Sequence, residues 1–210
     1  MLFIAALAAG LASPAAQAET DLSMESAHDV NEGVLTFLEQ LPTKPVHHHH
    51  NRILIDAESL NSGWVTLKQC HTNLDAVPRA QITFREGYVR DLKVEVSTHI
   101  KQAWVEGATV QLVDVEPGAR LCLLAQTRAF RNTGNGYFSL TSGPYMRKFL
   151  DGYYPMRVTL EIDYPAKTLQ LIDIAPQSQP GLILNATRGA IHLDATFEGE
   201  LNTLIQFEKI

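Results

Sequence analysis

Apolar and polar residues alternate with a period of two in many segments between Arg52 and the end of the sequence, which is typical of half-buried β-strands. The clearest segment is Met156–Tyr164, where every even-numbered residue is apolar and every odd-numbered residue is polar. Tyr88–Ser97 behaves in the same way, with Leu92, Val94 and Val96 on one face. The same criteria predict further strands at Arg52–Ala57, Trp64–Cys70, Ala80–Arg85, Ala108–Val115, Ala119–Thr127, Gly136–Thr141, Thr168–Ile174, Leu182–Thr187, Ala190–Thr196 and Glu200–Phe207.

Short polar junctions with glycine separate several of these segments and are suited to hairpin turns. They are Glu86-Gly87, Glu116-Pro117-Gly118, Arg188-Gly189 and Glu198-Gly199. One buried and one wet face for each strand is compatible with antiparallel sheets, whereas parallel sheets are usually covered on both faces. The sequence therefore predicts a mainly β, antiparallel sandwich-like domain, with a barrel as the alternative, and one N-terminal helix.

The N-terminal region has a different pattern. Residues 1–18 combine an apolar run with the small-residue triplet Ala16-Gln17-Ala18, as in a secretory signal peptide, and the run is too short to span a bilayer. Asp21–Leu41 carries apolar residues at helical spacing and precedes Pro42, which predicts a helix. We therefore expect a leader over 1–18, an acidic helix and linker over 19–45, one β-rich domain over 46–210, and export to the periplasm or the medium, with no transmembrane segment.

Composition and charge narrow the function classes. The chain has 45% hydrophobic residues and a formal charge of −6, which favours a globular domain and argues against binding to nucleic acid. Residues 118–157 nevertheless hold six bases and one acid. This run is either solvated surface charge or a face for an anionic or carbohydrate ligand, or for an exported protein partner. The candidate ligand-binding residues are Arg147, Lys148, Tyr153 and Arg157.

Cys70 and Cys122 are the two cysteines of the chain. In an oxidising compartment such an isolated pair is expected to form a disulfide, and two buried thiols or a thiolate metal ligand are the alternatives. His71 follows Cys70 directly, but adjacent strand residues point to opposite faces, so joint metal ligation by these two side chains is disfavoured.

A tetrad of histidines, His47–His50, is the most unusual local feature. On a strand the odd-numbered pair and the even-numbered pair face opposite ways, and either pair could chelate zinc or copper if further ligands such as His71 or His99 lay nearby. The alternative is a solvated connector. The candidate metal ligands are His47, His48, His49, His50 and His71.

Sequence signatures of catalysis are absent, including a nucleophile elbow, a zinc-protease helix motif and a phosphate-binding glycine loop. We therefore favour a non-catalytic exported binding or structural module and assign no catalytic residue. A metal-binding protein or metal-dependent hydrolase centred on the histidine tetrad is the alternative.

Overall fold

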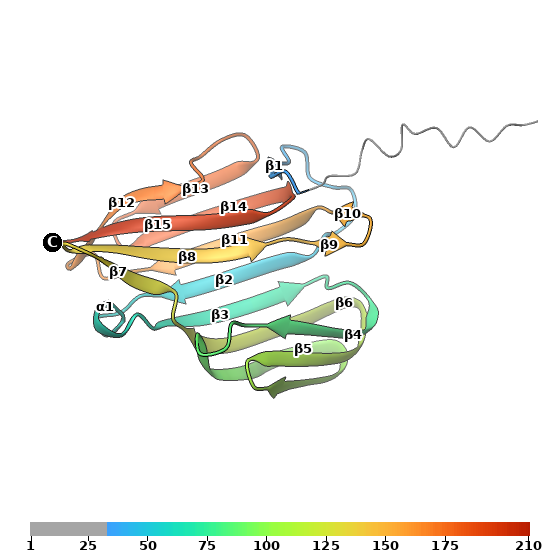
Figure 1. Cartoon of the computed structure of the whole chain (residues 1–210). Coiled ribbons are helices and arrows are strands. Elements are labelled where there is room, and N and C mark those ends of the chain that lie inside the picture. Colours follow the sequence, from blue (N-terminus) through green and yellow to red (C-terminus); the bar gives the residue numbers. More distant parts are fainter. Residues whose placement is uncertain (1–32) are drawn as a thin grey trace, which may run out of the picture. The chain divides into compact units, whose positions relative to one another are not determined.

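Strands make up most of residues 33–210, the part of the chain that the computed structural model describes (Figure 1). All strand pairs are antiparallel except β2 with β11, so the predicted mainly β class is confirmed. The predicted leader, and the predicted helix up to residue 32, lie outside the described residues. None of the described residues forms a helix that is long and apolar enough to cross a membrane.

Nine strands form the larger sheet, in the order β1-β14-β11-β2-β3-β6-β4, with β13 also pairing with β14 and β5 with β6. Its strands are β1 (Thr36–Phe37), β2 (His48–Leu54), β3 (Val65–Thr72), β4 (Val77–Thr83), β5 (Val89–Glu106), β6 (Thr109–Thr127), β11 (Met156–Asp163), β13 (Leu182–Thr187) and β14 (Ala190–Glu198).

A second sheet of four strands, in the order β12-β15-β8-β7, covers part of the larger one (Figure 1). Its strands are β7 (Phe130–Gly134), β8 (Tyr137–Tyr145), β12 (Leu169–Ala175) and β15 (Leu201–Lys209). A small hairpin of β9 (Lys148–Phe149) and β10 (Gly152–Tyr153) follows β8, and α1 (Ser59–Ser62) is a single turn between β2 and β3.

The main core lies between these two sheets. Val158, Leu160 and Ile162 of β11 are at most 1% exposed, as their alternation predicts. From the second sheet, Phe130 and Phe207 pack into the same cluster, with their ring centroids 6.0 Å apart. This arrangement is a sandwich in which burial of apolar side chains from both inner faces supplies the main stabilisation.

The rest of the larger sheet bends back on itself. β3 and β4 pair with successive halves of β6 along one edge, and β5 pairs with both halves along the other. The three strands β4, β5 and β6 bend over and enclose a second core. This core includes Val110, Leu112, Leu121 and Leu123. We call this part the curled lobe, defined as β4, β5 and β6.

The segment Glu116-Pro117-Gly118 is not a hairpin turn, which corrects the prediction. It lies within the continuous strand β6, at the bend of the curled lobe. The ladder skips residues 116–119, because Val115 and Arg120 are the flanking paired residues. The proline therefore removes no ladder hydrogen bond, and Gly118, at a φ of 76°, accommodates the bend.

Three further predictions need correction. Glu86-Gly87 does not close a hairpin, because β4 and β5 each pair with β6 and not with each other. From Gly33 to Leu41 the chain is not helical: it contains β1, which adds to the edge of β14. Tertiary pairing has therefore overridden the apolar spacing of this segment. Glu198-Gly199 also does not close a hairpin, because β14 belongs to the larger sheet and β15 to the smaller one. This turn carries the chain from one layer of the sandwich to the other.

The disulfide between Cys70 and Cys122 is present and confirms that prediction. The two cysteines are direct cross-strand partners on β3 and β6, with their Cα atoms 4.1 Å apart. The bond links the sandwich to the curled lobe, on the face of β3 opposite to that of His71.

Candidate functional site

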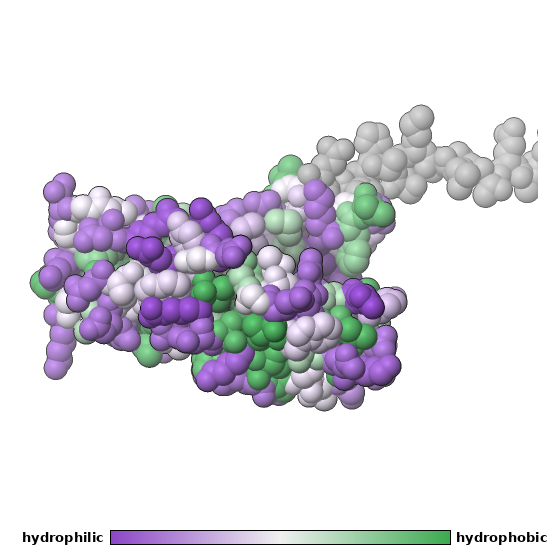
Figure 2. All heavy atoms as spheres, turned by 60° about the horizontal axis from the view of Figure 1, so that its bottom comes forward, coloured by the Kyte–Doolittle hydropathy of each residue, from purple (hydrophilic) through white to green (hydrophobic). Residues whose placement is uncertain are grey.

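A groove of about 530 Å³ lies over β2 and β3 of the larger sheet, between the second sheet and the curled lobe. Alternate residues of β2 and β3 form its floor, β8 forms one wall, and the end of β4 forms the other. Apolar side chains gather between hydrophilic ones over the curled lobe in Figure 2. Ile82, near the end of β4, and Phe84, just after it, are apolar residues that line the groove.

The floor contains a group of buried polar side chains on a face that is otherwise apolar. His49 pairs with His71 across β2 and β3, and Asn51 pairs with Gln69 two residues further along each strand. The next pair, Ile53 with Leu67, is apolar again. Asn51, Gln69 and His71 are only 4%, 6% and 2% exposed. The neighbouring strands β11 and β6 present buried valine and leucine on both sides of this group.

Hydrogen bonds join His47, His71 and Gln69. The amide Nε2 of Gln69 lies 2.7 Å from Nε2 of His71. Because an amide nitrogen can only donate, His71 accepts there and carries its proton on Nδ1. That Nδ1 lies 2.9 Å from Nε2 of His47, which therefore accepts. Both rings thus have a defined tautomer, fixed by the glutamine.

A second chain of hydrogen bonds starts at His49. Its Nε2 donates to the Asn51 carbonyl oxygen over 3.0 Å, and the Asn51 amide donates to the Tyr145 hydroxyl over 2.7 Å. The Tyr145 hydroxyl also hydrogen-bonds to Ser142, which lines the groove. The polar atoms of this group therefore have partners, so its burial does not carry the full cost of unsatisfied groups.

The three imidazoles of the floor are neutral at pH 7. Burial lowers the pKa of His47 to about 4 and that of His49 to about 3. Burial also places the pKa of His71 well below its ordinary value. Repulsion between a protonated His71 and the positive charges that His49 and His47 would carry when protonated is a smaller cause in the same direction. For His47, Asp75 acts to raise the pKa and Arg147 to lower it, but both effects are smaller than that of burial. The ring centroids of His49 and His71 are 4.3 Å apart.

His48 and His50 lie on the opposite face of β2, as the alternation predicts, and their rings stack 5.9 Å apart. His48 donates to the Thr159 hydroxyl over 2.8 Å, and Thr159 donates to Asp194 over 2.8 Å. Nε2 of His50 lies 3.2 Å from Oε1 of Glu161.

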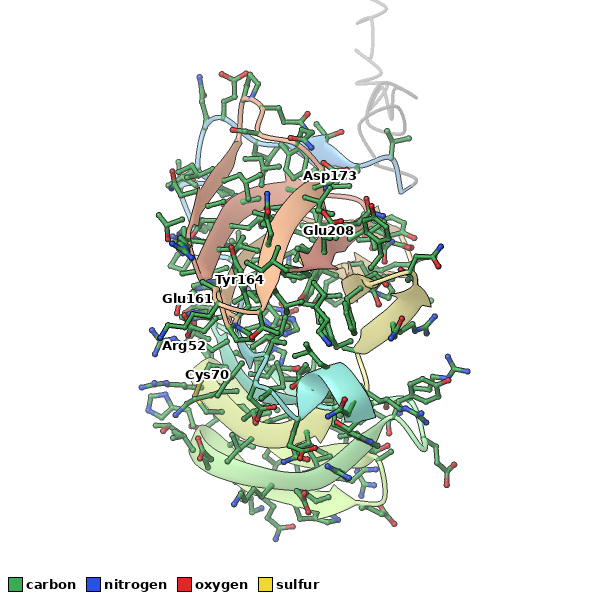
Figure 3. The ribbon with its side chains drawn as sticks, turned by 90° about the vertical axis from the view of Figure 1, so that its left-hand side faces the viewer. Arg52, Cys70, Glu161, Tyr164, Asp173 and Glu208 are labelled. Carbon is green, nitrogen blue, oxygen red and sulfur yellow. A yellow bond between two sulfur atoms is a disulfide. The ribbon has the colours of Figure 1, made fainter. Side chains whose placement is uncertain are left out.

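Glu161 also forms an ion pair with Arg52 (Figure 3). Burial acts to raise the pKa of Glu161, but the hydrogen bond from Arg52 and the nearby positive charges outweigh it and lower this pKa. The even-numbered histidines are thus part of an acidic and basic network on the outer face, separate from the groove.

The five histidines predicted as metal ligands are therefore divided. His47, His49 and His71 gather in the groove, whereas His48 and His50 do not. With the side chains as they stand, no group of three or more His, Cys, Asp or Glu within residues 33–210 is placed to hold a metal ion. His99, the other candidate ligand, lies at a bulge of β5.

The four residues predicted to bind a ligand are also divided. Lys148 and Tyr153 are partners in the β9–β10 hairpin, and the ammonium lies 5.0 Å from the ring centroid. Arg147 is held in a bidentate ion pair by Asp75, at 2.6 and 3.1 Å. Arg157 lies on the outer face of β11 and is paired with Asp194 at 2.8 and 3.0 Å.

Arginines without a carboxylate partner lie instead at the other end of the groove. Arg85, Arg128 and Arg131 line it, are exposed, and form no ion pair with any carboxylate of the described residues. The guanidinium of Arg85 lies 4.0 Å from the ring centroid of Tyr88. None of the described residues that line the groove is Asp or Glu, although the whole chain has more acids than bases.

Sequence reasoning missed Asn51, Gln69 and Tyr145. A signal for Gln69 was present, because it follows Val65 and Leu67 at the same inward-facing positions of a predicted strand. A polar residue on the apolar face of a strand is informative, since it must be hydrogen-bonded or functional. No sequence signal placed Tyr145 against Asn51.

Comparison with protein-family models, with curated proteins and with solved structures finds no match to this chain.

Proposed function

We propose that the protein is an exported, non-catalytic binding module, and that its ligand occupies the groove between the second sheet and the curled lobe. Export is supported by the leader-like residues 1–18 and by the disulfide. The observation that carries the binding role is the buried polar group of Asn51, Gln69 and His71 on the floor, with the half-buried His49 paired to His71.

This group is hard to explain by stability alone. Apolar residues at these four positions would continue the cores that surround them and would avoid the cost of desolvating polar atoms. Concave sites that combine an apolar lining with a few fixed polar groups are the usual form of small-molecule sites. The volume of about 530 Å³ lies in the range of such sites.

A probe that does not depend on the natural ligand tests this role. Nile red is uncharged and becomes fluorescent in apolar surroundings, so a fluorescence titration should show saturable binding. Thr83 is an exposed residue of β4 on the wall of the groove, and Thr83→Trp should weaken the binding about tenfold or more by filling the space. Thr98→Trp, at an exposed position of β5 outside the groove, is the matched control. Absence of saturable binding, or equal binding by the two variants, would refute the proposal.

Metal binding remains the second candidate, because His47, His49 and His71 lie together with neutral rings. Nε2 of His47 and Nδ1 of His71 are 2.9 Å apart. Nitrogen ligands on tetrahedral zinc, with bonds of about 2.0–2.1 Å, stand roughly 3.4 Å apart. A zinc or copper ion could therefore replace the proton that these two rings share after small rotations, and His49, whose ring centroid lies 4.3 Å from that of His71, would be the candidate third ligand.

Elemental analysis of untagged protein, purified without a nickel column, tests this candidate. Metal binding predicts one zinc or copper ion per chain, lost in His47→Ala and retained in His50→Ala, which alters the outer face. Less than stoichiometric metal, or equal loss in both variants, would remove the candidate and leave the groove as an organic ligand site.

A further inference from the structure

A second cavity of about 410 Å³ adjoins the arginine end of the groove. Tyr88, Arg128 and Arg131 line both spaces, so they form the boundary between them. The second cavity is otherwise lined mainly by α1 and the start of β7, including Ser59, Ser62 and Asn132. Like the groove, it has no Asp or Glu among the described residues that line it.

From this arrangement we infer that the ligand is an amphipathic anion, whose carboxylate or phosphate group binds between Arg128 and Arg131 while its apolar part lies in the groove. The inference rests on the proposed binding function and specifies the chemistry of the ligand. Two guanidinium groups without carboxylate partners, beside the Asn132 amide, form a suitable site for an oxyanion.

The length of the groove supports an elongated ligand. Thr127, which precedes Arg128, is the cross-strand partner of Val65, whereas His71 lies six residues further along β3. At about 3.3 Å per residue, the arginines and the histidines are roughly 20 Å apart along the strand. Ile53, Leu67 and Phe84 line the space between them and provide apolar contacts for a chain.

The inference also explains the charge of the site. Arg147 and Arg157 are neutralised by Asp75 and Asp194, whereas the arginines at the groove have no such partner. A groove without carboxylates in a chain of net charge −6 leaves a local positive field, which attracts anions.

Competition against Nile red tests the inference with three compounds that share one chain: decyl phosphate, decanoate and decan-1-ol. In the wild type, both anions should displace the dye at concentrations at least tenfold lower than the alcohol. In Arg128→Gln/Arg131→Gln this preference should fall below threefold. Arg188→Gln, at the exposed β13–β14 turn, is the matched control and should keep the preference. Circular dichroism checks that the variants keep the strand content of the wild type.

The outcomes separate the inference from the proposed function. If decan-1-ol competes as well as the anions, or if the double variant keeps the preference, the anion site is wrong while the groove remains a binding site. Displacement by inorganic phosphate at the concentrations at which decyl phosphate acts would show a site for a free oxyanion and overturn the amphipathic ligand. If Nile red does not bind to the wild type, both proposals fail.

Discussion

Acidification should destabilise this protein well above the range in which its carboxylates titrate. His71 is buried and His47 and His49 are half-buried, and the pKa values of all three in the folded state lie below the ordinary value of 6.5. Between about pH 6.5 and pH 4 the unfolded chain therefore binds more protons than the folded protein. Stability is present in full above that range and is lost as the pH falls through it.

The magnitude follows from the pKa values. With folded-state values of about 4 for His47 and about 3 for His49, both rings stay neutral at pH 5.5 in the folded protein. Lowering the pH from 7.5 to 5.5 then costs about 1.4 kcal/mol for each histidine. These two together cost about 3 kcal/mol, which is a large part of the usual stability of a domain. His71, whose pKa burial places well below its ordinary value, adds to the loss. His48, whose pKa is lowered by burial, acts in the same direction.

Urea unfolding at pH 7.5, 6.5 and 5.5, followed by the fluorescence of Trp64 and Trp104, measures this loss. His47→Gln keeps a hydrogen-bonding group but cannot titrate, so its stability should fall by about 1.4 kcal/mol less than that of the wild type over the same range. The pKa values of Glu161 and Asp194 are lowered, so the loss due to them lies at more acidic pH. A wild-type loss below about 1.5 kcal/mol, or the same loss in His47→Gln, would refute the buried neutral cluster.

Two structural predictions follow from individual contacts. Cys70→Ser/Cys122→Ser should lower the free energy of unfolding by about 4 kcal/mol, because the disulfide closes a loop with a sequence separation of 52. Equal urea midpoints for this variant and the oxidised wild type would contradict this prediction. Gly199→Ala should lower the free energy of unfolding, measured in urea, by more than about 2 kcal/mol, since its Cβ would lie 2.3 Å from the Val34 carbonyl oxygen. Gly87→Ala has a similar positive φ but open space around it, so it should lower the free energy of unfolding by only about 1 kcal/mol. Similar costs for the two glycines would show that β1 moves freely away from Gly199.

The alternation of residues was sufficient to locate most strands. Segments such as Met156–Tyr164 were placed within a residue or two, because side-chain direction along a strand is a local property with a period of two. The same property correctly separated the odd-numbered from the even-numbered histidines of the tetrad. The cysteine pair also needed no knowledge of the fold, since chain chemistry and the expected compartment favoured one bond.

Helical spacing was less reliable. The apolar residues from Val34 to Leu41 fit a helix as well as a strand, and pairing of β1 with β14 decided for the strand. In the same way, Pro117 and Gly118 indicated a turn, but β5 continues beside both halves of β6 and keeps the strand in the sheet. Local patterns state what a segment can form, and its neighbours in space select among the options.

The mainly β class, the faces of the strands and the cysteine pair can be read from the amino-acid sequence, since they depend on residues close together in the chain or on chemistry alone. In contrast, the position of His71 opposite His49, and the hydrogen bond from Gln69 that fixes the tautomer of His71, result from the packing of the folded chain. The same packing places Asp75 where it neutralises Arg147, and Arg128 and Arg131 where they border two cavities. These relations depend on strand register and sheet order, which are set by cooperative packing between segments far apart in sequence and have no local periodic signature.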